Sequence, residues 1–158
     1  MEALPEFRLH RPATLDEALA TAEAEPGARF LAGGTDLIVN MRRGLVETPA
    51  LIDLNDVAEM QGIARDGGTL TIGGAVTIDD LSRDDGVAQD FPAIAQAAAE
   101  VAGSTHRNVA TVGGNLCLDT RCIFYNQSQW WRESNDYCLK YRGEICHVAP
   151  KSKRCFAL

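Results

Sequence analysis

Ala32-Gly33-Gly34-Thr35-Asp36-Leu37 is the stretch that decides the fold of this 158-residue chain. A short apolar run, Arg29-Phe30-Leu31-Ala32, precedes the two glycines, and a helical stretch over residues 37–43 follows them. This order predicts a strand, a glycine turn and a helix N-terminus, where main-chain N–H groups can approach an anion without a Cβ in the way. The spacing matches neither G-x-G-x-x-G nor G-x-x-x-x-G-K-[ST], so it indicates neither a Rossmann site nor a P-loop.

A second loop, Thr111-Val112-Gly113-Gly114-Asn115, has the same chemistry. Both loops place paired glycines beside small hydroxyl or amide side chains. Either loop taken alone is also explained as a tight turn, because paired glycines are common in turns. Together with the cysteine-rich stretch that follows them in the sequence, the two loops favour a diphosphate site.

The rest of the first 116 residues alternates predicted helices and strands. Thr14-Leu15-Asp16-Glu17 is a capping-box pattern that predicts a helix to about residue 24. Strands are predicted at 51–54 and 70–74, and a longer helix from Pro92 to about Ala102. The pattern indicates a mixed α and β fold.

The last 42 residues differ sharply in composition from the rest. They hold all five cysteines, seven of the ten aromatic residues and every lysine. Residues 1–116 carry eight Lys and Arg against 18 Asp and Glu, whereas residues 117–158 carry seven against four. An acidic body argues against a nucleic-acid partner. The break indicates a separate module, and the cysteines in it point to a metal site.

Length and composition are typical of one soluble globular domain. The sequence contains no run of 18 apolar residues, and its first residues, Met1-Glu2-Ala3-Leu4-Pro5-Glu6, do not resemble a signal peptide. We therefore expect a cytoplasmic protein without a membrane partner.

Three motifs together resemble the FAD-binding medium subunits of the xanthine dehydrogenase and carbon monoxide dehydrogenase family of molybdenum hydroxylases. They are the opening Phe7-Arg8-Leu9-His10-Arg11-Pro12-Ala13-Thr14 and the two glycine loops, extended to Leu37 and Leu116. The resemblance covers the whole chain and implies the N-terminal portion of such a subunit. It implies an α+β fold with two small α/β subdomains of the PCMH-type FAD-binding fold, at residues 1–56 and 57–158. The second would be incomplete and carry a cysteine-rich insertion at about 117–158, after the second glycine loop.

Carried across by position, the resemblance implies that both loops contact the FAD diphosphate and ribityl chain. The implied residues are Phe30, Leu31, Ala32, Gly33, Gly34, Thr35, Asp36, Leu37, Thr111, Val112, Gly113, Gly114 and Asn115. Thr77 and Val101 resemble further flavin-lining positions, although a helix cap and a core residue explain them equally well. Asp119 is a further candidate for a flavin contact.

The chain departs from the common family pattern after Leu116. Its cysteine-rich insertion resembles that of the 4-hydroxybenzoyl-CoA reductase branch, whose flavin subunit holds an additional 4Fe–4S cluster. Four thiolates suffice for such a cluster, and we select Cys122, Cys138, Cys146 and Cys155 as ligands. Cys117 continues the glycine loop and is expected to be a small buried residue beside the cofactor. Zinc, free structural cysteines and disulfides remain alternatives.

The resemblance implies an electron-relay subunit of a 4-hydroxybenzoyl-CoA reductase. Ferredoxin would reduce the 4Fe–4S cluster, the cluster would reduce FAD, and FAD would reduce 2Fe–2S clusters and a molybdenum–molybdopterin cofactor on partner subunits. The implied partners are a molybdenum-cofactor large subunit and a 2Fe–2S small subunit, in a dimer of heterotrimers. No catalytic residue is expected in this chain. The alternatives are the flavin subunit of another molybdenum hydroxylase and a non-redox module with a zinc-stapled loop.

Overall fold

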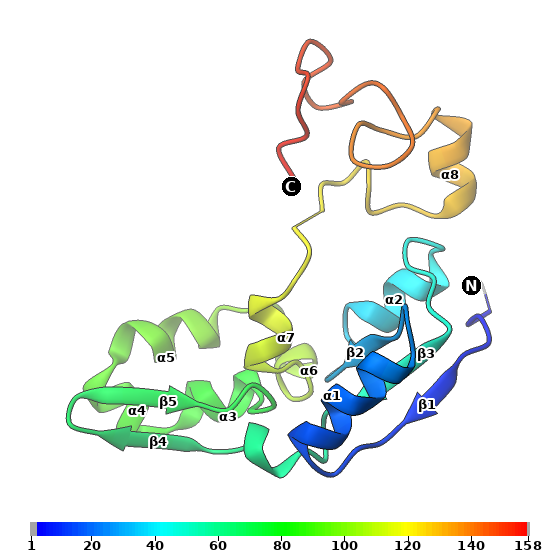
Figure 1. Cartoon of the computed structure of the whole chain (residues 1–158). Coiled ribbons are helices and arrows are strands. Elements are labelled where there is room, and N and C mark those ends of the chain that lie inside the picture. Colours follow the sequence, from blue (N-terminus) through cyan, green and yellow to red (C-terminus); the bar gives the residue numbers. More distant parts are fainter. Residues whose placement is uncertain (1–2, 158) are drawn as a thin grey trace. The chain divides into compact units, whose positions relative to one another are not determined.

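The computed structural model describes residues 3–157, which form two compact units. We name residues 6–38 and 48–117 the two-sheet unit, and residues 3–5, 39–47 and 118–157 the cysteine-rich unit. Figure 1 labels the helices and strands along the chain. The sequence suggested two subdomains divided at residue 56. Residues on both sides of this boundary contribute to the two-sheet unit, and the division stays a prediction.

A three-stranded parallel sheet forms the first part of the two-sheet unit. Its order is β1 (Arg8–His10), β3 (Ala50–Asp53) and β2 (Arg29–Leu31). Arg8 pairs with Ala50 in the register of β1 and β3, and Phe30 pairs with Ile52 in that of β2 and β3. The first three residues of β3 have no exposed surface, as expected for the centre of a parallel sheet.

Helix α1 (Leu15–Ala24) connects β1 to β2 and begins where the capping box predicted. The Thr14 hydroxyl oxygen accepts a hydrogen bond from the Glu17 N–H at 3.2 Å. The Glu17 carboxylate in turn accepts one from the Ala13 N–H at 2.8 Å. These bonds satisfy N–H groups that have no partner within the helix, so the predicted start is confirmed.

A second sheet is the antiparallel hairpin of β4 (Ile63–Asp66) and β5 (Thr69–Ile72). Its turn consists of Gly67 and Gly68, with φ angles of 52° and 83°, the combination that a two-residue hairpin turn of type I′ requires. Three helices pack with this hairpin around a common core: α3 (Ile78–Arg83), α4 (Asp85–Asp90) and α5 (Pro92–Ala99). The buried residues of this core are Val76, Ile78, Leu81, Val87, Ala95 and Ala98.

The remaining elements are short. They are α2 (Leu37–Arg42), a 3-10 helix (Ala58–Met60), α6 (Ser104–Arg107), α7 (Val112–Leu116) and α8 (Gln129–Ser134). The helix predicted from Pro92 to Ala102 ends earlier, at Ala99. The chain leaves the helical conformation at Ala102, whose φ of 47° is left-handed, and Gly103 follows.

The cysteine-rich unit has little regular structure, and α8 is the one helix in its long segment from residue 118 to 157 (Figure 1). Its small core consists of Leu45, Tyr125 and Cys138. Leu45 comes from residues 39–47, more than 70 residues before the cysteines. The module that composition predicted is therefore completed by a distant segment that composition did not mark.

Candidate functional site

The first glycine loop lies between β2 and α2 and touches the chain just before the second loop. A Cβ on Gly33 would lie 1.8 Å from the carbonyl oxygen of Val109, far inside any tolerated contact. Gly33 is therefore required for two main-chain segments to approach each other. This contact places the first loop beside the segment that leads into Thr111.

The second loop is paired with the segment at residues 73–77. Thr77 and Thr111 form an antiparallel bridge, and the Val112 N–H donates to the Val76 carbonyl at 2.9 Å. The Gly113 N–H donates to the Gly74 carbonyl at 2.8 Å, and a Cβ on Gly113 would lie 2.8 Å from that oxygen. The structure thus brings together both glycine loops and Thr77, three parts of the site that the sequence predicted separately.

The two loops offer different groups to an anion, which corrects the sequence-based view that both present main-chain N–H groups. In the second loop, the N–H groups of Val112, Gly113, Gly114 and Asn115 all donate to oxygens of the protein. In the first loop, neither the N–H nor the hydroxyl of Thr35 has a hydrogen-bond partner among residues 3–157. The first loop is therefore the better donor of main-chain hydrogen bonds.

The second glycine of each pair leaves the loop surface open. Gly34 has a left-handed φ of 70°, and a Cβ there would meet only the side chains of Ile38 and Leu31, at 3.2 and 3.4 Å. A Cβ on Gly114 would meet only the Thr111 hydroxyl oxygen, at 3.1 Å. A diphosphate can approach bare main chain at both positions. The residues present thus fit the diphosphate of FAD.

Three outlying predicted residues have other contacts. The Thr77 hydroxyl caps α3, accepting from the Asp80 N–H at 3.0 Å, and Val101 packs against the core beside α5. These are the two structural roles that the sequence left open for them. Asp119 belongs to the cysteine-rich unit, where its carboxylate pairs with the Lys140 ammonium at 2.8 Å.

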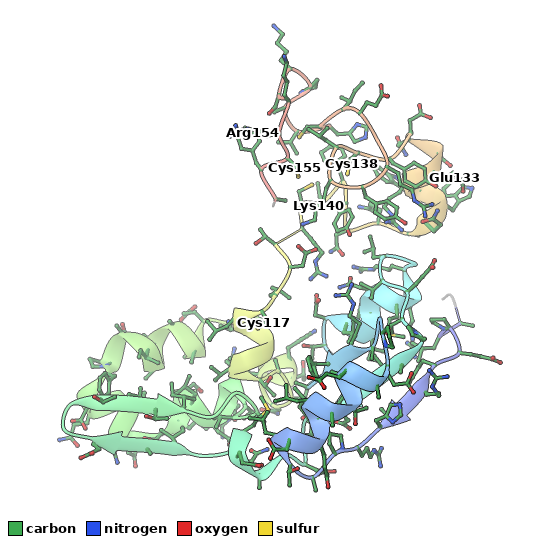
Figure 2. All side chains as sticks on the ribbon, in the orientation of Figure 1. Cys117, Glu133, Cys138, Lys140, Arg154 and Cys155 are labelled. Carbon is green, nitrogen blue, oxygen red and sulfur yellow. The ribbon has the colours of Figure 1, made fainter. Side chains whose placement is uncertain are left out.

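The cysteines differ in burial. Cys138 and Cys146 are buried, whereas Cys122 and Cys155 are half-buried. Cys117 is exposed at the C-terminal end of α7 in the two-sheet unit, so the expectation that it is buried is wrong. It lies just past the last turn of a short surface helix, where neighbouring segments do not cover it. Figure 2 labels Cys117 on α7 and places Cys138, Cys155 and Lys140 in the loops that follow.

Lys140 ties the cysteine-bearing segments together. Its ammonium donates to the Asp119 carboxylate at 2.8 Å, to the Thr120 carbonyl at 2.5 Å and to the Ala157 carbonyl. The side chain is only 8% exposed. Nearby, the Leu139 N–H donates to the Ile145 carbonyl at 3.0 Å, which holds the residues next to Cys138 and Cys146 together.

The sequence expects Cys122, Cys138, Cys146 and Cys155 to share one centre. Across residues 3–157, no group of three or more histidine, cysteine, aspartate or glutamate side chains could hold a metal ion. Cys138 packs with Leu45 and Tyr125, and oxygen atoms of the neighbouring segments bind the Lys140 ammonium. The ligand set stays a prediction.

The pKa of Tyr125 is shifted by burial and by the charged side chains around its ring. Burial, and secondly the negative charge of Asp119, raise the pKa of its phenol above the usual 10.0. The cations of Lys140, Arg132 and Arg121 act in the opposite direction. Because the net shift is upward, burial and the Asp119 carboxylate outweigh the three cations around this ring.

Sequence reasoning missed the segment that supports the second loop. Gly74 and Val76 supply the carbonyls that fix Thr111–Asn115, and Val109 limits the first loop to glycine. A signal was present, because Gly73-Gly74 is a further glycine pair, directly after β5. A Cβ on Gly73 would lie 2.2 Å from the Met60 carbonyl oxygen.

Comparisons with known proteins agree with this geometry. Residues 5–154 match the family model described as the FAD binding domain in molybdopterin dehydrogenase. The chain is 38% identical over 131 residues to the aldehyde oxidoreductase FAD-binding subunit PaoB of Escherichia coli strain K12, covering 82% of this chain and 40% of that protein. It is 34% identical over 113 residues to the carbon monoxide dehydrogenase medium chain of Hydrogenophaga pseudoflava, covering 71% of this chain and 39% of that one.

Solved structures show the same fold. Quinoline 2-oxidoreductase from Pseudomonas putida 86 superimposes with a TM-score of 0.72 at 33% identity, covering 74% of this chain and 41% of that chain. Carbon monoxide dehydrogenase from Hydrogenophaga pseudoflava gives a TM-score of 0.70 at 33% identity, covering 72% and 40%. The fold and the paired-glycine site therefore define an FAD-binding domain of mixed α and β structure.

The chain belongs to the family of FAD-binding domains of molybdopterin dehydrogenases, as the resemblance predicted. It spans about 40% of the length of the curated relatives that it matches. Among the described residues, no helix is both long and apolar enough to cross a membrane.

The Gly33 contact gives a direct test of how the loops are held. Gly33→Ala should lower the free energy of unfolding of the chain by about 1–3 kcal/mol, because the new methyl group forces the Val109 main chain away. Gly103→Ala is the matched control, since nothing lies within 4 Å of a Cβ there, and it should cost less than about 1 kcal/mol. Equal urea midpoints for the two variants would contradict the proposed loop contact.

Proposed function

We propose that the chain is the FAD-carrying part of an electron-transfer subunit in a molybdenum hydroxylase-type oxidoreductase. The observation that carries the proposal is the close packing of Gly33, in the first glycine loop, on the Val109 main chain that leads into the second loop, in a chain of this family. When bound, FAD supplies hydride and single-electron chemistry. The chain's own residues bind and orient the cofactor.

Roles follow from the polar groups that each loop leaves free. The N–H and hydroxyl of Thr35, next to the open main chain of Gly34, are placed to donate to diphosphate oxygens. The N–H groups of the second loop are already hydrogen-bonded within the protein, so this loop can contact the cofactor as a fixed surface. Its exposed Asn115 side chain supplies an amide. Phe30, the middle residue of β2, has 49% of its surface exposed, so it can cover a bound cofactor.

We further propose that the cysteine-rich unit holds a 4Fe–4S cluster through Cys122, Cys138, Cys146 and Cys155. Four thiolates around one zinc ion lie ~3.8 Å apart, given a Zn–S bond of about 2.3 Å. In a cluster each thiolate binds a different iron, so the sulfur atoms lie further apart and a single-ion geometry is not required. Metal binding and folding are coupled, so ligand side chains settle as the cluster binds.

Three features of the cysteine-rich unit support the cluster. All four cysteines belong to this one unit, and two of them are buried. The Ala157 N–H donates to Cys155 Sγ at 3.3 Å, the kind of bond that stabilises cluster thiolates. Lys140 is a nearly buried cation, which favours a negatively charged group nearby.

The whole enzyme has two candidate identities, which differ in the direction of electron transfer. A 4-hydroxybenzoyl-CoA reductase, with ferredoxin as electron donor, is the candidate that the cysteine-rich unit favours. Relatives named xanthine dehydrogenase and carbon monoxide dehydrogenase favour the opposite direction, in which electrons leave the substrate. In both cases we propose that the substrate site lies on a molybdenum-cofactor large subunit, with a 2Fe–2S small subunit as second partner in a dimer of heterotrimers.

The FAD proposal is tested by titration of the chain with FAD, followed by flavin fluorescence. We expect saturable binding, and at least about tenfold weaker binding for Thr35→Val, because a hydrogen bond to a charged group contributes about 1.5–3 kcal/mol. Thr71→Val, an exposed substitution on β5, should bind as the unchanged chain does. An unchanged chain that leaves FAD fluorescence unaffected throughout the micromolar range would sink the proposal.

The cluster proposal is tested by metal analysis of anaerobically prepared chain. About four irons per chain and bleachable visible absorption are expected for the unchanged protein. Cys138→Ser should lose the iron, whereas Cys117→Ser, at the exposed end of α7, should retain it. One zinc without iron, or full iron content in Cys138→Ser, would refute the proposed ligands.

A further inference from the structure

Arg132 is the largest fully buried side chain among the described residues, with 2% of its surface exposed. Its Nη2 donates to the carbonyls of Arg43 and Gly44, at 3.2 and 3.0 Å, and to the side-chain oxygen of Gln129 at 2.8 Å. All three acceptors are uncharged. Its Nε and Nη1 are buried and have no hydrogen-bond partner within residues 3–157.

Such a charge is costly without compensation. A buried guanidinium loses its hydration, and uncharged acceptors replace that loss only in part. The rings of Tyr141 and Tyr125 lie 5.1 and 5.9 Å from its central carbon and supply some cation–π attraction. Two nitrogen atoms, which carry three N–H bonds, and most of the charge are still left for another anion.

The two tyrosines connect Arg132 to the cysteines. Tyr125 and Cys138 are buried in one apolar cluster, and Tyr141 and Cys122 pack against it. Lys140, the second nearly buried cation of the unit, lies 5.3 Å from the Tyr125 ring. The carboxylate paired with Lys140, that of Asp119, is 61% exposed and therefore screened by water. The interior of the unit is thus cationic around Cys122 and Cys138.

We propose that Arg132 is the buried countercharge of the thiolate-held cluster and sets its reduction potential. The inference rests on the cluster proposed above. Reduction adds one electron to the cluster and makes it more negative by one charge. A positive charge held in a low-dielectric interior stabilises that form, so Arg132 raises the potential. It acts through its charge and needs no bond to sulfur.

Arg142 provides a matched control. Its guanidinium lies 4.9 Å from the same Tyr141 ring, but the residue is exposed. Replacing Arg142 by an uncharged residue changes the net charge by the same amount as replacing Arg132, and the two guanidinium groups lie at similar distances from the Tyr141 ring. Water screens the exposed group, so a smaller effect is expected.

The experiment is a dithionite redox titration of the iron-loaded chain, monitored by electron paramagnetic resonance. Arg132→Met should lower the ratio of reduced to oxidised cluster at a fixed potential at least about tenfold, which is 59 mV for a one-electron couple. Arg132→Lys and Arg142→Met should change that ratio less than about threefold, since Lys keeps the buried charge and Arg142 is screened.

The outcomes separate this inference from the proposed function. A chain that binds no iron overturns the cluster and the role of Arg132 together. An iron-loaded Arg132→Met with the unchanged potential, or an equal shift in Arg142→Met, overturns only the role of Arg132. If Arg132→Met fails to hold iron, Arg132→Lys decides: an unchanged potential supports the countercharge, and a tenfold shift contradicts it.

Discussion

The close approach of Gly33 to the Val109 carbonyl is the constraint on which the flavin site depends. No other residue type fits between these two main-chain segments, because any Cβ would overlap the carbonyl oxygen. Gly113 has the same role against Gly74. One glycine of each pair is therefore committed to packing one segment on another, and the second keeps the loop surface open. Each loop needs two glycines because one packs against another main-chain segment and the other leaves the main chain open to a ligand.

The cysteine-rich unit is held together by different interactions. Its apolar core is small, and long polar side chains hold it together: Lys140 joins three segments, and Arg132 joins α8 to the end of α2. Polar contacts of this kind are costly to bury and strongly directional. A unit built this way gains stability from a bound anionic cluster, which is consistent with the proposed role of its buried cations.

Local patterns in the sequence predicted much of the fold. The capping box at Thr14 fixed the start of α1, and the apolar run before Gly33 predicted β2. The strand β1 was missed, because three residues of mixed polarity show no periodicity before pairing with β3. The leucines at positions 15 and 19 of α1 stay 41% and 50% exposed, and the buried residue of this helix is Ala18.

The site was predictable in its parts and not in its arrangement. Sequence and family resemblance marked both glycine loops, but not the bridge from Thr77 to Thr111, because a single pair of extended residues has no sequence signature. Likewise, the composition break marked the cysteines but not residues 39–47, whose contacts to the cysteine-rich segment depend on Arg132 and Leu45. Contacts between residues far apart in the sequence are set by packing, which local patterns do not encode.

Amide hydrogen exchange at Thr35, with and without FAD, tests whether the first glycine loop binds the diphosphate. This N–H has no partner within the described chain, so it should exchange rapidly in the free protein and slow markedly when FAD binds. The amides of Gly113 and Gly114, already bonded within the protein, should change far less. Saturating FAD that leaves Thr35 exchange unchanged would contradict the account.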